Sequence, residues 1–163
     1  MKTVFEPLSE QYREDVIDIL NYYISSTTAA FRDDVVGYSY FDNFLDKANV
    51  YSGYVMTNEE GTVMGFCTLE PFKNIKPFQK TAEVMYFIKR EYVGKGIGKA
   101  TLSQLEKDAE EHGINKLVVD ITDDNEVSIT FHKRNGFTEY GRLNDCWRKF
   151  EKDLGIIYME KQI

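Results

Sequence analysis

Three glycines at alternate positions, Gly94, Gly96 and Gly98, show the spacing that most clearly predicts chemistry in this chain. They follow an apolar run and precede a segment with helical periodicity, so they stand where a strand passes into a helix. Glycine lets the backbone approach a ligand closely, and the free N–H groups of a helix start bind anions. Lys95 and Lys99 add positive charge there. We predict a phosphate-binding loop, the alternative being a flexible turn.

The spacing does not match two well-known nucleotide-binding loops. The P-loop pattern GxxxxGK[ST] requires a glycine where Lys99 stands and a lysine where Ala100 stands. The dinucleotide pattern GxGxxG also requires a glycine at position 99, within an early strand–helix–strand unit. The loop therefore disfavours ATP and NAD as ligands.

Glu83 is the one carboxylate within the apolar run 82–88, which is typical of an interior strand. Burial there would raise the pKa of a glutamate toward neutrality, where a carboxylate serves as a general base. Two other roles stay open, a solvated strand-edge glutamate or an ion-pair partner of Lys80. His132 lies on a predicted helix, where a lone histidine can be a packing residue. His112 lies near the predicted C-terminal end of a helix, where a positive charge on the surface interacts favourably with the helix dipole.

Nothing in the sequence predicts a metal site or a cysteine nucleophile. The two histidines lack ligand spacing, and the acidic run of Asp120, Asp123 and Asp124 is interpreted as a solvated strand end. Cys67 lies in an apolar strand without a histidine at motif spacing, so an inert buried thiol is expected. Cys67 and Cys146 are too few for a disulfide framework and are expected to be reduced.

The pattern of apolar and turn-forming residues around these groups predicts one α+β domain over residues 1–163. It has a mostly antiparallel sheet and a central strand–loop–helix unit. Strands are predicted at 3–5, 50–56, 62–69, 82–88, 117–121, 137–143 and 155–161. Helices are predicted after Ser9, at 40–45, from the glycine loop to Gly113, and at 125–134.

Composition excludes several classes of protein. A chain of 163 residues is long enough to bury a core without metal or disulfide staples. A net charge of −7 and a pI near 4.9 oppose binding to nucleic acid. No apolar run approaches the ~20 residues of a bilayer span, and residues 1–6 do not begin a secretory signal. We expect a cytoplasmic protein that binds neither nucleic acid nor membrane.

Residues 93–100, opening a helix after an apolar strand, resemble the coenzyme A pyrophosphate loop of the GNAT acetyltransferases, [Q/R]-x-x-G-x-[G/A]. Gly96 and Gly98 fit this pattern, whereas Val93 stands at the Gln/Arg position. Other parts of the chain resemble the phosphinothricin acetyltransferase-like branch in order. These parts are residues 21–31, 83–88, 125–137, 149–150 and 159–161.

This resemblance implies a GNAT fold, with a mixed, mostly antiparallel central sheet flanked by helices. It implies transfer of the acetyl group of acetyl-CoA to the primary amine of a small molecule by direct attack. The acceptor would be an amino acid or an analogue such as phosphinothricin or methionine sulfoximine or sulfone. Glu83 would be the general base, and His132 either the acid for the leaving thiolate or a coenzyme contact. The branch also suggests a homodimer.

Two groups of binding residues follow from the resemblance. Coenzyme contacts are expected from Tyr86, Phe87, Ile88, Gly94, Lys95, Gly96, Ile97, Gly98, Lys99, Asn125 and Arg134. Acceptor contacts are expected from Phe31, Phe72, Lys73 and Phe78. Lys73 stands where the branch often has Arg. Asp153 and Gly155 stand in the region where it often has Trp and Asp. These departures imply that the acceptor can differ from phosphinothricin. Two other functions stay open, acetylation of a protein N-terminus or lysine, and non-catalytic binding of an acyl-CoA.

Overall fold

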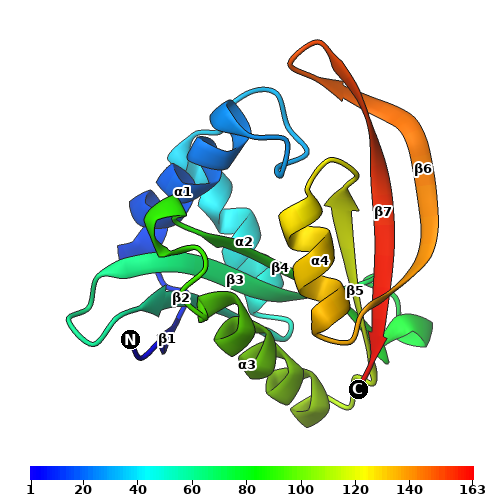
Figure 1. Ribbon diagram of the computed structural model, residues 1–163. Helices are drawn as coiled ribbons and strands as arrows, with labels where there is room; N and C mark the ends of the chain where they lie inside the picture. Colours follow the sequence, from blue (N-terminus) through cyan, green and yellow to red (C-terminus); the bar gives the residue numbers. More distant parts are fainter.

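Seven strands form one sheet in the order β1-β2-β3-β4-β5-β7-β6 in the computed structural model, which describes residues 1–163 (Figure 1). The strands are β1 (Val4–Pro7), β2 (Ser52–Thr57), β3 (Val63–Pro71), β4 (Thr81–Ile88), β5 (Lys116–Thr122), β6 (Thr138–Lys149) and β7 (Lys152–Gln162). The helices are α1 (Arg13–Ser26), α2 (Phe41–Ala48), α3 (Ile97–Glu111) and α4 (Glu126–Arg134). Only the β4–β5 pair is parallel, which confirms the predicted α+β class.

The helices cover the two faces of the sheet in pairs (Figure 1). On one face, apolar residues of α3 and α4 such as Leu105 and Ile129 pack against β2–β5. On the other, α1 and α2 bury Ile17 and Phe41 against Phe66 and its neighbours. The central strand β3 is buried on both faces, which is why it reads as a nearly unbroken apolar run. No helix is both long and apolar enough to span a bilayer.

The parallel pair at the middle of the sheet opens partway along its length. Strand β4 pairs with β3 from Ala82 to Ile88 but pairs with β5 only from Thr81 to Glu83. Beyond Glu83 the two strands separate, and Figure 1 shows α4 in front of this opening. The β5-facing edge of β4, residues 84–88, therefore has no strand partner. Residues 89–93, with a 3-10 turn at Arg90–Tyr92, connect this edge to the glycine loop.

The β6–β7 hairpin is longer than the sequence predicted. Residues 144–149 and 152–154 continue the strands, and the chain reverses at Phe150 and Glu151, both with positive φ. Nearly all of β6 is exposed on both faces, so it lacks the apolar alternation that marks a strand. A register shift between Leu143 and Trp147 interrupts its pairing further.

Candidate active site

The glycine loop adopts a backbone that only glycine takes without strain. Gly94 and Gly96 have φ of +80° and +84°, in the left-handed region. A Cβ built on either would meet no atom within 4 Å, so the requirement comes from the backbone angles rather than from crowding. Gly96 directly precedes the first residue of α3. The left-handed turns allow the chain to pass from the short 3-10 turn Arg90–Tyr92, which follows β4, into α3.

This loop presents a row of unused hydrogen-bond donors. The N–H groups from Gly94 to Lys99 donate to no backbone acceptor, and the first bond of the turn is from the Ala100 N–H to the Gly96 carbonyl, 3.1 Å. Consecutive free N–H groups at the positive end of a helix form a cradle for an anion. Lys95 adds charge beside it, with Nζ 5.2 Å from the Tyr92 ring centroid. The loop has the donors that a pyrophosphate needs.

Along the unpaired edge of β4, the side chains are fixed away from the opening. Phe87 packs on Tyr23 and Phe66, with ring centroids 4.9 and 5.7 Å away. The Tyr23 hydroxyl donates to the Ile88 carbonyl. Tyr86 points to the opposite face of the sheet, where its ring lies 6.3 Å from that of Phe131 on α4. The strand can therefore present its backbone to a ligand without moving its side chains.

Glu83 lies at the point where β4 and β5 separate, and it faces the α1–α2 side of the sheet. Its carboxylate accepts no hydrogen bond, and Lys80 forms no ion pair with it. Burial is the main cause that raises its pKa to about 7; the negative charges of Asp120 and Glu70 contribute to this rise, and Lys47 opposes it. A carboxylate of this kind is protonated below neutrality and ready to accept a proton above it.

His132 is buried and engaged at both ring nitrogens. Nδ1 lies 2.7 Å from the Ser128 carbonyl, which only accepts, so Nδ1 carries the hydrogen. Nε2 lies 2.7 Å from the Tyr86 hydroxyl, which then donates to it. Burial lowers the pKa of the imidazole, which favours this neutral form. The histidine thus fixes the Tyr86 side chain and directs no proton of its own into the opening.

The predicted acceptor residues fall into two separate groups. Phe72, Lys73 and Phe78 lie together in the β3–β4 loop, with the two rings 6.1 Å apart and Lys73 Nζ 5.0 Å from the Phe78 centroid. Lys73 also lines a surface hollow of about 340 Å³ that it shares with His112. This loop joins the ends of β3 and β4 beside Glu83.

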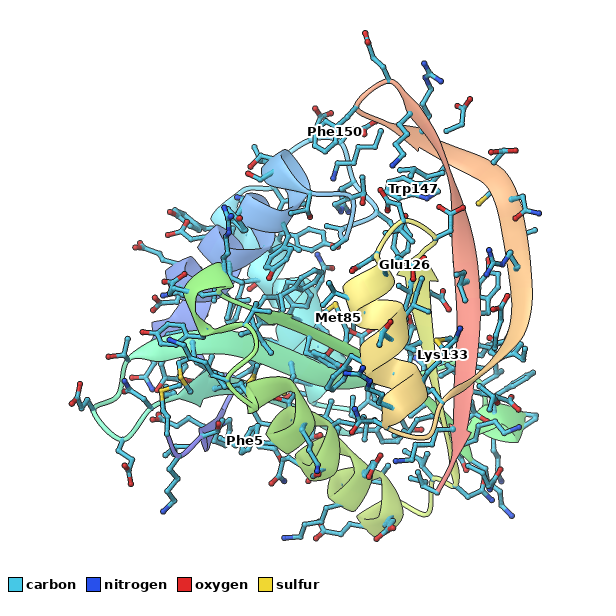
Figure 2. All side chains as sticks on the ribbon, viewed as in Figure 1. Phe5, Met85, Glu126, Lys133, Trp147 and Phe150 are labelled. Atoms are coloured by element: carbon cyan, nitrogen blue, oxygen red, sulfur yellow. The ribbon has the colours of Figure 1, made fainter.

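Phe31 belongs to the other group, in the connection between α1 and α2. Its ring lies 5.1 Å from that of Trp147 on β6, and Lys149 Nζ donates to the Ala30 carbonyl at 3.1 Å. Trp147 belongs to the hairpin, and Figure 2 shows it on the side of the hairpin that is turned toward this connection. No ring contact joins Phe31 to Phe72.

The two predicted coenzyme contacts on α4 have different surroundings. The Asn125 side chain caps the helix by accepting the Ser128 N–H at 3.2 Å. Arg134 is exposed at the last turn and forms no ion pair. Its side chain is therefore free to contact a ligand.

Sequence reasoning missed Asp120 and Glu70. Asp120 is half-buried in β5 on the same face as Glu83, and not at a solvated strand end. Glu70 pairs directly with Glu83 across β3 and β4 and binds Lys47 Nζ at 2.9 Å. The period-two alternation of β5 was the available signal for Asp120, because it places that residue on the face of Val118.

Comparison with known proteins agrees with this geometry. The model of the acetyltransferase (GNAT) family matches residues 16–137. The L-methionine sulfoximine/L-methionine sulfone acetyltransferase of Salmonella typhimurium is 28% identical over 152 residues, and the L-amino acid N-acyltransferase MnaT of Escherichia coli is 26% identical over 152 residues. Each alignment covers 91% of this chain and 87% of the relative.

The solved structures show the same fold. The phosphinothricin acetyltransferase from Sinorhizobium meliloti, in complex with acetyl-CoA, superimposes with a TM-score of 0.93 at 22% identity, over 100% of this chain and 89% of that one. The family match spans the glycine loop, the opening of the sheet and Glu83. The chain therefore belongs to the GNAT family of acetyl-CoA-dependent N-acetyltransferases.

Proposed function

We propose that this enzyme acetylates the primary amine of a small amino-acid-like acceptor, with Glu83 as the general base. One observation carries the proposal. A cradle of free N–H groups and a carboxylate with a pKa near 7 lie at the two ends of one unpaired strand edge. At 3.3 Å per residue, that edge of β4 is roughly 17 Å long. The relatives named for amino acids and methionine analogues support the acceptor class.

Acetyl-CoA, when bound, supplies an acetyl group activated as a thioester. The N–H groups from Gly94 to Lys99 would hold its pyrophosphate, with Lys95 and Lys99 adding positive charge. Along the edge of β4, a backbone N–H near Phe87 would donate to the acetyl carbonyl oxygen. Such a donor stabilises the negative charge that develops on this oxygen during attack.

Glu83 would remove the proton from the acceptor. An ammonium ion has no lone pair, so one N–H bond must break before attack, and the hydrogen passes to a carboxylate oxygen of Glu83. Because the pKa of Glu83 is raised to about 7, the carboxylate is a stronger base than an ordinary glutamate and still largely ionised above neutrality.

The contacts of His132 support a packing role over that of an acid, because the side chain is buried and both ring nitrogens are engaged within the protein. Its neutral ring holds the Tyr86 hydroxyl at 2.7 Å, beside the unpaired edge of β4. We assign it to the positioning of Tyr86. The homodimer, the cytoplasmic location and the acceptor contacts of Phe31, Phe72, Lys73 and Phe78 remain predictions.

Thiol release from acetyl-CoA, read colorimetrically across acceptors, tests the proposal. The panel contains free amino acids, methionine sulfoximine and sulfone, phosphinothricin, polyamines and short peptides. We expect turnover with amino-acid analogues. Turnover with peptides alone would favour a protein acceptor. Binding of acetyl-CoA by calorimetry without thiol release would favour a non-catalytic module.

A further inference from the structure

Three carboxylates from three adjacent strands share one face of the sheet. Glu70 on β3 is the direct register partner of Glu83 on β4. Glu83 in turn pairs with Val118 on β5, and Asp120 is the next residue of β5 on that face. This row crosses the sheet where β4 and β5 begin to separate. Asp120 therefore stands beside the base, on the far side of the opening.

The three carboxylates differ in what compensates their charge. Glu70 is buried but fully engaged, since Lys47 Nζ donates to one oxygen at 2.9 Å and Thr68 Oγ1 to the other at 2.7 Å. Glu83 and Asp120 are half-buried and accept no hydrogen bond. No group of three acidic or other ligating side chains is arranged to hold a metal ion. Two neighbouring half-buried carboxylates thus stand without a cation of their own.

The surrounding elements add no cation to the pair. Tyr158 of β7 lies opposite Asp120 in register, and Tyr140 of β6 lies beside it with ring centroids 6.0 Å apart. Farther along β5, Lys116 binds Glu160 at 3.2 Å. From α2, Lys47 is the cation whose charge reaches Glu83, and Glu70 already holds it.

We propose that Asp120 is a positioning residue that acts through Glu83, the two carboxylates binding one proton between them. Two carboxyl groups held close in a partly buried site do not both ionise readily, so the second one loses its proton only at a higher pH. Asp120 thereby makes Glu83 a stronger base than burial alone would. The inference rests on the proposed role of Glu83 and adds the residue that sets its basicity.

The proton balance of the step is simple. An N–H bond of the acceptor ammonium breaks, an O–H bond forms on the Glu83–Asp120 pair, and the electron pair stays on nitrogen for the attack. Before the next turnover the pair returns this proton to solvent. Burial raises the pKa of both carboxyls, and Asp120 is the largest charge acting on Glu83.

The test compares the pH dependence of kcat/KM in the wild type and in Asp120→Asn. Removing the negative charge of Asp120 makes Glu83 easier to ionise. We expect the acidic limb to move to lower pH by at least about half a unit. Asp153→Asn is the matched control, because it removes the same charge from an exposed residue at the far end of the hairpin. An acidic limb that stays in place in Asp120→Asn, as in the control, would overturn the proposal.

A second measurement needs neither the variant nor turnover. Titration of the carboxyl carbons of the wild-type protein by ¹³C NMR should show that the Glu83 and Asp120 resonances each report two coupled ionisations. Independent single-step curves would reject the shared proton even if the enzyme proved active. If the curves are coupled but the protein has no acetyltransferase activity, the proposed function is rejected, whereas the proton shared by Glu83 and Asp120 is supported.

Discussion

At the scale of single residues, the site combines groups that the sequence reveals with one that it hides. The glycine loop and Glu83 could be predicted because each departs from its local pattern, three glycines at a helix start and one carboxylate in an apolar strand. Asp120 could not be found in this way, since it begins a run of acidic residues that resembles a solvated strand end. The alternation of β5 places it on the face of Val118, and the register of Val118 with Glu83 then places it beside Glu83.

The raised pKa of Glu83 predicts a trade-off between stability and function. Between the ordinary value of 4.5 and about 7, the folded protein holds a proton here that the unfolded chain has lost. The free energy of unfolding therefore falls as pH rises through this window. Glu83→Gln should raise it at pH 8 by on the order of 2 kcal/mol, with a much smaller gain at pH 5. Urea titrations at both pH values measure this, and equal gains at the two pH values would contradict it.

Substitution of Gly96 should weaken coenzyme binding, and a control glycine with the same left-handed backbone separates this effect from the cost of backbone strain. Gly61, in the turn between β2 and β3, has φ of +81° and the same open space around its Cβ position. Gly96→Ala and Gly61→Ala should each destabilise the fold by about 1 kcal/mol. Calorimetry should show that only Gly96→Ala weakens acetyl-CoA binding, by about tenfold or more. Equal affinity in the two variants would argue against the cradle.

At the scale of elements, most strands and helices could be predicted from apolar periodicity, but the far end of the β6–β7 hairpin could not. Most residues of β6 there are exposed, so the chain carries no apolar alternation. It is held by pairing of residues 147–149 with 152–154 and by tertiary contact with the α1–α2 connection, through Trp147 on Phe31 and Lys149 on Ala30. Contacts between segments so far apart in sequence leave no local pattern.

This contact predicts that the hairpin steadies the α1–α2 connection. An aromatic pair contributes about 0.5–1.5 kcal/mol, so Trp147→Ala should speed amide hydrogen exchange in residues 27–33 roughly 2- to 12-fold. Leu143→Ala, a truncation at an exposed position of the same strand, is the control and should leave that exchange unchanged. Unchanged protection in Trp147→Ala would show that the connection is held by other contacts.

At the scale of the whole molecule, the proposed mechanism depends on an interruption in an otherwise continuous sheet. Pairing between β4 and β5 stops at Glu83, and the unpaired edge of β4 runs from Glu83 toward the glycine loop. The sequence predicted both ends of this line, because each has a local signal. The opening between them arises from strand register, which single-strand patterns do not encode. The helices on both faces keep the rest of the sheet closed.

The most direct test of the account is the rate of thiol release by Glu83→Gln with the best acceptor of the panel, beside its affinity for acetyl-CoA. Glutamine keeps the size of the side chain and removes the proton-accepting oxygen. The account predicts that kcat falls by at least about 100-fold, the scale of a lost general base, while the Kd for acetyl-CoA is unchanged. A variant that turns over at the wild-type rate would contradict the role of Glu83 and with it the proposed mechanism.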